Sequence, residues 1–414
     1  MSVDGATAAG RRPELDAIRT IVVVGLVFVH AALVFDASDD FYVKNPETTA
    51  VTTVLAGFGV VWAMPALFLI AGVGAWHSIS RRGPGGFARE RLSRLGVPLL
   101  FAVLTFLPVP QWLRLTAADP GYHESYWAFL PRFYDVGWEP SDFPFILDGE
   151  FFETGHLWFV VLLLTFSLAL APLVRWTPRT LSRRLRAAVA RAATRRGTTL
   201  LPAAATAAIC GVAGMEESFA GWSRWAYLLF FACGFLLASD DRLRAAMRRD
   251  AKVAAVLGVL AFAATGPLLM TAGDDAFTAT TAHAIVARTL FGFSGWCWVV
   301  AILGLLDRPR PASAATTRGR RSAVRTVYGY LANGALPLYI LHQPIVVAVA
   351  YGIVRMDAPI IVKYLVIVAA SLVLTVSAYE LLVRRTRLTR WLFGMRGTTA
   401  RPASAQDASP VTVK

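Results

Sequence analysis

The feature of the sequence with the clearest chemical potential is a histidine inside an apolar run. His30 lies within residues 18–35, and no charged residue separates it from Arg19. Ionisable side chains inside a membrane span are costly and are usually functional. A neutral imidazole can accept the proton of an alcohol. We therefore predict that His30 is a general base. The alternative is a histidine that hydrogen-bonds to a neighbouring helix for packing.

Two charged residues precede His30 on one face of the expected helix. Arg19 lies eleven residues earlier, which corresponds to three turns plus about 20° and a rise of about 16 Å. Asp16 falls within about 40° of the same stripe. The stripe thus joins a carboxylate and a guanidinium at one membrane surface to an imidazole inside the bilayer. We predict Asp16 and His30 as its catalytic residues.

An arginine cluster precedes the third apolar run. It comprises Arg89, Arg91 and Arg94, and the last two share a helix face because they are three residues apart. Guanidinium groups suit phosphate, since they form forked hydrogen bonds. The cluster predicts docking of a phosphate-bearing ligand. For Arg81 and Arg82, ordinary positive charge beside a membrane is the stronger interpretation.

Among the other ionisable residues inside predicted spans, we consider Arg288, His342 and Glu380 as functional candidates. Arg288 could bind an anionic group or pair with a carboxylate outside the membrane, and the sequence favours neither. Glu380 lies near the end of its span, where a side chain that reaches the interface explains it better than a functional role.

The amino-acid composition indicates the class of protein that positions these residues. Of 414 residues, 56% are hydrophobic and 16% are charged, and the mean hydropathy is +0.53. Soluble chains are about 25% charged, so a soluble enzyme and a disordered chain are both excluded. The three cysteines each lie in an apolar run, which argues against a disulfide scaffold. A polytopic membrane protein remains.

Ten apolar segments are candidates to cross the bilayer, which needs about 20 residues each. They are 18–35, 51–76, 95–113, 156–174, 199–214, 222–238, 253–272, 282–306, 334–354 and 359–383. The fifth and sixth are short and could together form a re-entrant hairpin. The prediction is therefore an all-α membrane bundle of about ten transmembrane helices.

The charges between these segments predict their orientation. The side that carries both termini holds 34 of the 41 basic residues, and the opposite side holds five. Basic loops stay in the cytoplasm, so both termini are expected there. The same clustering between apolar runs argues against a nucleic-acid partner, despite a net charge of +14. We expect a cytoplasmic segment 1–17, a membrane domain 18–385, and a disordered basic cytoplasmic tail 386–414.

One long loop, 114–155, lies on the opposite side and is rich in aromatic and acidic residues. Its aromatic side chains are typical of a belt at the membrane interface, which we consider the better explanation. They could instead form a platform on which sugar rings stack.

Five segments carry a resemblance to a known family. The run Arg12–Arg19, with His30 after ten more residues, resembles the opening of the acyltransferase family 3 membrane proteins. The similar segments that follow are Trp62–Gly72, Arg89-x-Arg91 with Arg94 and Pro98, Gly155–Phe159 and Leu338–Pro344. Together they span about residues 11–385. The residues of these segments most resemble those of the glucans biosynthesis protein C branch, the glucan succinyltransferases.

The resemblance implies an acyl-CoA co-substrate at the cytoplasmic face and a glycan or other hydroxyl acceptor outside, in an inner or plasma membrane. It implies His30 as the essential base. It also assigns Arg19, Arg89, Arg91 and Arg94 to acyl-CoA binding, while His156, Arg288 and His342 are possible acceptor-binding or supporting residues. We expect no metal site and no bound cofactor.

Two other functions remain open from the sequence. A transporter or flippase of a glycan or small hydrophobic substrate explains the spans and Arg288, but it does not explain the Arg19–His30 stripe. A non-catalytic membrane scaffold predicts that loss of the His30 imidazole is harmless.

Overall fold

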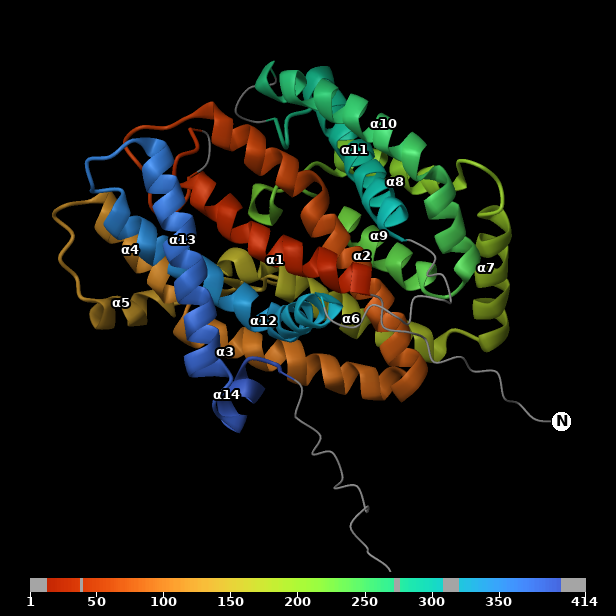
Figure 1. Cartoon of the computed structure of the whole chain (residues 1–414), viewed down its shortest axis with the longest axis horizontal. Coiled ribbons are helices and arrows are strands. Elements are labelled where there is room, and N and C mark those ends of the chain that lie inside the picture. The colour runs from red at the N-terminus through yellow and green to blue at the C-terminus, as the bar shows by residue number, and fades with distance from the viewer. Residues whose placement is uncertain (1–12, 38–39, 272–275, 308–319, 396–414) are drawn as a thin grey trace, which may run out of the picture.

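Helices form almost all of the regular structure (Figure 1). The computed structural model describes residues 13–37, 40–271, 276–307 and 320–395. The helices are α1 (Pro13–Leu33), α2 (Ala50–Arg91), α3 (Val97–Thr105), α4 (Pro108–Ala118), α5 (Tyr126–Phe133), α6 (Trp158–Trp176), α7 (Arg179–Ala192), α8 (Leu201–Ala213), α9 (Arg224–Leu237), α10 (Asp241–Thr271), α11 (Ala282–Leu306), α12 (Arg320–Ile353), α13 (Ile360–Ala378) and α14 (Arg387–Leu392). Within the described ranges, the β structure is one short antiparallel pair, β1 (Gly137–Trp138) and β2 (Leu147–Asp148).

In the part of the chain that the structure describes, eight helical stretches are long and apolar enough to cross a membrane. One of them, Ala50–Ala118, contains two of the predicted spans, because the chain leaves helical geometry at Gly83. Gly83 has a φ of +70°, a left-handed conformation that a residue without Cβ adopts without a clash. The predicted all-α polytopic membrane bundle is confirmed.

The predicted fifth span is too short to cross alone. Helix α8 with the 3₁₀ turn before it covers Thr198–Ala213, which corresponds to a length of about 24 Å against a hydrocarbon core of about 30 Å. The sixth reaches spanning length when the 3₁₀ turn before α9 is included, as Glu217–Leu237. Of the two short candidates, only the sixth is long enough by itself.

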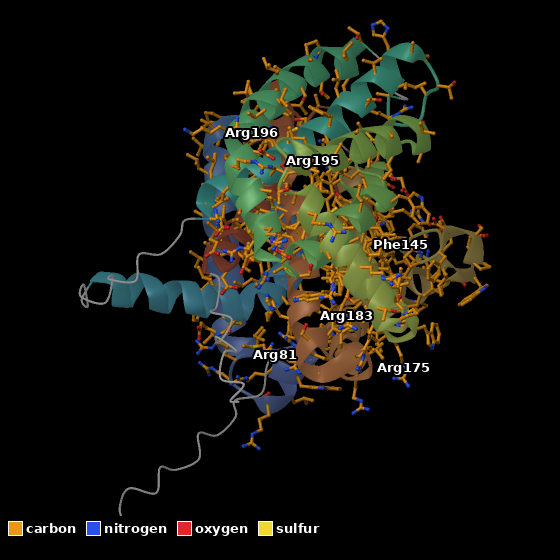
Figure 2. All side chains as sticks on the ribbon, turned by 90° about the vertical axis from the view of Figure 1, so that its right-hand side faces the viewer. Arg81, Phe145, Arg175, Arg183, Arg195 and Arg196 are labelled. Atoms are coloured by element: carbon orange, nitrogen blue, oxygen red, sulfur yellow. The ribbon has the colours of Figure 1, made fainter. Side chains whose placement is uncertain are left out.

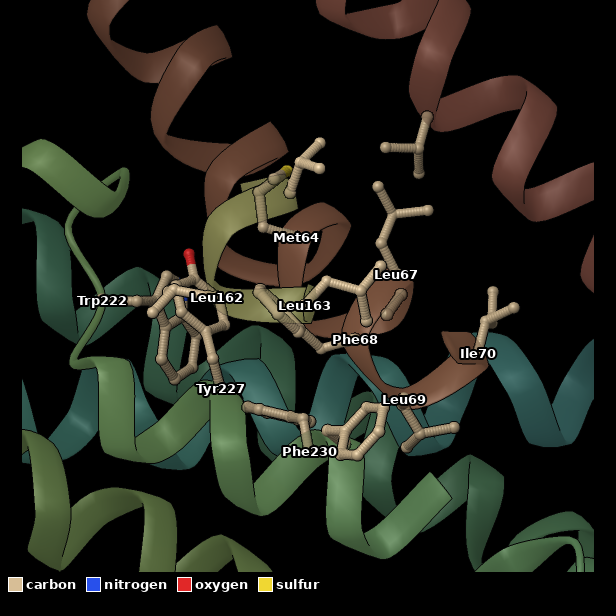
Figure 3. Packing of buried hydrophobic residues seen from close by; sticks show 14 of the residues in the cluster. Met64, Leu67, Phe68, Leu69, Ile70, Leu162, Leu163, Trp222, Tyr227 and Phe230 are labelled. Atoms are coloured by element: carbon tan, nitrogen blue, oxygen red, sulfur yellow. The ribbon is translucent and has the colours of Figure 1, made fainter. Parts of the chain in front are cut away.

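The core is built where helices approach closely. A Cβ on Gly72 of α2 would collide with the carbonyl oxygen of Phe231, and one on Gly234 of α9 with that of Leu69. Small residues allow this close approach inside a membrane, where apolar contact alone does not drive helices together. Figure 3 shows the aromatic packing beside this contact, with Phe68 near Tyr227 at a ring-centroid distance of 4.5 Å.

A second buried apolar cluster surrounds α1 on its other sides. Its members come from α1, α4, α12, α13 and the segment after α1, and include Val27, Phe35, Val346 and Ile367. Helix α1 packs against α2, α12 and α13. This arrangement holds the helix that carries His30 in the middle of the bundle.

The long segment 114–155 is a packed structure. Phe129 and Phe133 of α5 are fully buried, whereas Trp127, Trp138 and Phe143 are each more than 60% exposed. The two buried rings therefore serve packing and are not available for an interface belt or a sugar platform.

The first residues of the segment 386–414, which was expected to be a disordered tail, are folded. Residues 387–392 form α14, and Phe393 is buried against Phe101 at a ring-centroid distance of 5.5 Å. The chain therefore remains packed on α3 beyond residue 386, and 396–414 and 1–12 lie outside the described residues.

Candidate active site

Three imidazoles meet inside the bundle. His30 comes from α1, His156 from the turn before α6, and His342 from α12. The rings of His30 and His342 have centroids 5.1 Å apart, as do those of His156 and His342. His342 is 1% exposed and His156 is 6% exposed, while His30 is half-buried. The sequence marked these residues separately, and the fold makes one cluster of them.

The tautomer of His342 follows from its hydrogen bond. Its Nδ1 lies 2.5 Å from the carbonyl oxygen of Tyr339. A carbonyl only accepts, so the ring hydrogen is on Nδ1 and the lone pair of the neutral ring is on Nε2. That Nε2 is buried and has no hydrogen-bond partner among the described residues. His342 thus presents a base-type nitrogen in a fixed orientation.

His156 is clamped to α12 at three points. Its backbone N–H donates to Oε1 of Gln343 at 3.0 Å, and its Nε2 lies 3.2 Å from the carbonyl oxygen of Ile340. Its own carbonyl accepts from the hydroxyl of Tyr339. With Nε2 donating to a carbonyl, His156 joins two helices and positions the cluster.

The local sequence of α12 explains this clamp. Pro344 lies inside the helix and has no N–H to donate to the carbonyl four residues earlier, which is that of Ile340. A free carbonyl inside a membrane needs another donor. The His156 ring supplies it.

His30 differs from His156 in having an unpaired buried nitrogen. Its Nδ1 has no hydrogen-bond partner within the described part of the chain. The ring stacks on Phe41, with centroids 5.8 Å apart and planes at 27°. His30 and His342 therefore face each other with one unpaired buried nitrogen each, and His30 is the more accessible of the two.

The predicted stripe of Asp16, Arg19 and His30 lies along α1, but Asp16 and His30 at its two ends are far apart. Arg19 and Asp16 form an ion pair at 3.5 Å, and both side chains are partly exposed. Along α1, Asp16 lies fourteen residues from His30, a distance of about 21 Å. Asp16 is thus a partner of Arg19 and not of His30.

The predicted arginine cluster divides into different environments. Arg91 is half-buried, with its guanidinium 5.0 Å from the ring centroid of Phe87. Arg94 donates to the carbonyl of Gly394 at 3.1 Å and pairs with Glu90 at 3.5 Å. Arg89 is exposed. Arg94 therefore fastens α14 to the start of α3, and Arg89 is the most open of the three.

Two other predicted residues lie in their own local contacts. The buried guanidinium of Arg288 donates to three backbone carbonyls, those of Ala276, Ala279 and Gly211. Arg288 thus fastens the end of α8 to the segment before α11. Glu380 pairs with Arg384 at 2.5 Å and is 39% exposed.

A carboxyl group just outside the cluster was not marked by the sequence. Glu153 accepts from the hydroxyl of Tyr42 and lies three residues before His156. Burial raises the pKa of this carboxyl, and the Tyr42 hydrogen bond and the charge of Arg114 oppose the rise. It was one of eight acids in its loop, so only the fold distinguishes it.

Tyr339 and Gln343 were also missed as functional residues. Both lie in the Leu338–Pro344 segment, and their spacing from His342 places them within one turn of it. The described residues include no group of three His, Cys, Asp or Glu side chains arranged to hold a metal ion.

A comparison with protein families finds one match. Residues 12–380 match the acyltransferase domain that defines acyltransferase family 3. No curated protein and no solved structure matches the chain. The matched range contains all three clustered histidines and every predicted arginine. Because the match covers nearly the whole sequence, the chain belongs to acyltransferase family 3 and is a multi-pass membrane acyltransferase.

Proposed function

We propose that the protein moves an acetyl or succinyl group from acyl-CoA to a hydroxyl of an extracytoplasmic glycan or a related acceptor. The observation that carries this proposal is the cluster of His30 with His342, because it holds an accessible imidazole in the centre of the bundle. The family supports acyl transfer in general. The donor, the acceptor and the base are our inference.

The reaction is a direct transfer. The acceptor hydroxyl lies at the imidazole of His30, which takes its proton as the oxygen attacks the thioester carbonyl. The resulting tetrahedral species breaks its carbon–sulfur bond. The CoA thiolate leaves and receives the proton from the imidazolium. The ester and the free thiol are the products, and His30 returns to its neutral form.

The donor end is at the surface that carries the start of α1. Arg19 lies about 16 Å from His30 along α1, so a ligand held there by its phosphates can extend a long arm to the imidazole. Arg91 and the exposed Arg89 offer further phosphate contacts. Arg94 already bonds within the protein, so we give it a supporting role.

The acceptor end is at the opposite surface. The segment after α1 brings Phe41 against the ring of His30, so the loop before α2 adjoins the base. The charge distribution between the spans favours the non-cytoplasmic side for this surface. The resemblance to acyltransferase family 3 supports a plasma or inner membrane as the location. A succinyl donor follows from the branch that the sequence resembles, and an acetyl donor is the alternative.

The test is release of free CoA by protein purified in detergent. Acetyl-CoA and succinyl-CoA are compared, each with and without a crude glycan extract. We expect acceptor-dependent release from one donor, and a loss of about 10²–10⁴-fold in His30→Ala, as for removal of a general base. His283→Ala is the matched control, because His283 is exposed on α11.

Two outcomes would count against the proposal. Full release by a well-folded His30→Ala protein would refute the assignment of the base. No release from either donor, with glycan movement across liposomes containing the protein, would favour a transporter.

A further inference from the structure

Helix α7 exposes an apolar stripe. Leu181, Leu185 and Val189 recur every fourth residue, and their side chains are 47%, 54% and 37% exposed. Each step of four residues advances by about 40° around an α-helix, so the three lie on one face. Among the described residues, this face is therefore only partly covered, although α7 belongs to a packed protein.

Basic side chains occupy a different face of the same helix. Arg183, Arg184 and Arg191 are all exposed. They lie about 100–160° around the helix from Leu185. An apolar stripe beside a strip of arginines is the pattern of a helix that lies in the interface of an anionic membrane.

The side of α7 that carries Arg186 and Ala190 holds the helix in place. The guanidinium of Arg186 lies 5.0 Å from the ring centroid of Trp76 on α2, and Ala190 is buried. Arg249 of α10 donates to the carbonyls at the C-terminal end of α7, including that of Ala193 at 3.2 Å. Because this face is attached to the protein, the apolar stripe remains turned outward.

The position of α7 fits a membrane boundary. It begins three residues after Trp176, the 78%-exposed last residue of the spanning helix α6. Exposed tryptophan is typical of the interface between hydrocarbon and headgroups. Figure 1 shows α7 along the right-hand edge of the molecule, and Figure 2, seen from that side, shows Arg175, Arg183, Arg195 and Arg196 on the facing surface.

We infer that α7 is an interfacial helix that binds anionic phospholipid. Its apolar stripe enters the boundary of the acyl chains, and its arginines contact the lipid phosphates. Phospholipid is the occupant that supplies both an apolar phase for the stripe and negative charge for the arginines. The leaflet is the one on the side where α6 ends.

The first test measures contact with acyl chains. A bimane label is placed at Leu185→Cys or at Ala187→Cys, in a background whose native cysteines are replaced by alanine. Ala187 is exposed on the same helix about 160° away. In nanodiscs with doxyl-labelled phosphatidylcholine, we expect several-fold stronger quenching at 185 than at 187. Equal quenching would overturn the proposal, as would protection of position 185 from both lipid and aqueous quenchers, which means a protein partner.

The second test measures the headgroup. Phosphatidylglycerol retained by the full-length protein is counted by native mass spectrometry. We expect Arg183→Gln/Arg184→Gln to retain several-fold less than wild type. Arg385→Gln/Arg387→Gln removes the same charge from exposed positions beside α14 and is expected to retain the wild-type amount. Equal retention by both double variants would contradict specific binding at α7. Neither test involves acyl transfer.

Discussion

Nε2 of His156 lies 3.2 Å from the carbonyl oxygen of Ile340, the carbonyl that Pro344 leaves without its helical donor. A break in one helix thus becomes the docking point for the start of another. The turn of α12 between Ile340 and Pro344 also places His342 beside this contact. The cluster is therefore built into the contact between α12 and the turn that precedes α6.

His156→Ala tests this positioning role. The change leaves the buried carbonyl of Ile340 without a donor, which costs about 1–3 kcal/mol. We expect a lower midpoint of thermal unfolding in detergent, together with reduced acyl transfer. His30→Ala removes no hydrogen bond within the described residues and is expected to unfold near the wild-type temperature. Equal midpoints for wild type and His156→Ala would contradict the clamp.

Much of the architecture follows from the sequence, because a helix that crosses the bilayer requires a long apolar segment, which is visible in the sequence. Each of the ten apolar segments corresponds to helix in the structure. The residues at which the helices begin were less predictable from the sequence. Helix α10 begins at Asp241 and α12 at Arg320, each about twelve residues or more before its apolar part, because a helix continues through polar residues outside the membrane.

The candidate site was predictable only in part. The apolar surroundings of His30 and His342 marked both residues, since a buried ionisable group is conspicuous in a span. Their contact was not predictable, because it depends on α12 packing against α1 across more than three hundred residues of sequence. Helical spacing correctly placed Asp16 on the same face of α1 as His30. Residues that share a helix face can still be far apart along the helix axis, and these two are separated by about 21 Å.

His342 offers a test of its fixed tautomer. The amide of His342→Asn can donate to the carbonyl of Tyr339 as Nδ1 does, but it places no acceptor at the position of Nε2. His342→Gln reaches that position with its amide oxygen. If the Nε2 lone pair aligns His30 or the acceptor, we expect the Asn variant to lose at least tenfold more turnover than the Gln variant, at similar stability. Turnover is measured as the maximal rate of CoA release, and equal losses would assign His342 a packing role.

Arg91→Ala tests phosphate docking at the donor end. A lost charge-assisted hydrogen bond costs about 1.5–3 kcal/mol. We expect the acyl-CoA concentration for half-maximal rate to rise about tenfold or more, with an unchanged dependence on acceptor. Arg81→Ala is the control, because Arg81 is exposed in the same basic stretch and was assigned no ligand. An unchanged acyl-CoA dependence in Arg91→Ala would exclude Arg91 from the donor site.

Glu153 makes stability depend on pH in a defined direction. Burial raises the pKa of its carboxyl above the value in the unfolded chain, so the folded state holds this proton more tightly. Stability therefore falls as the pH rises from the unfolded pKa through the raised folded pKa, because the folded state must give up a proton that it favours. Glu153→Gln keeps an oxygen that can accept from Tyr42 and removes the charge. We expect the variant to unfold at a higher temperature than wild type at neutral pH and at the same temperature at acid pH. A variant less stable than wild type at neutral pH would show instead that the ionised carboxylate stabilises this loop.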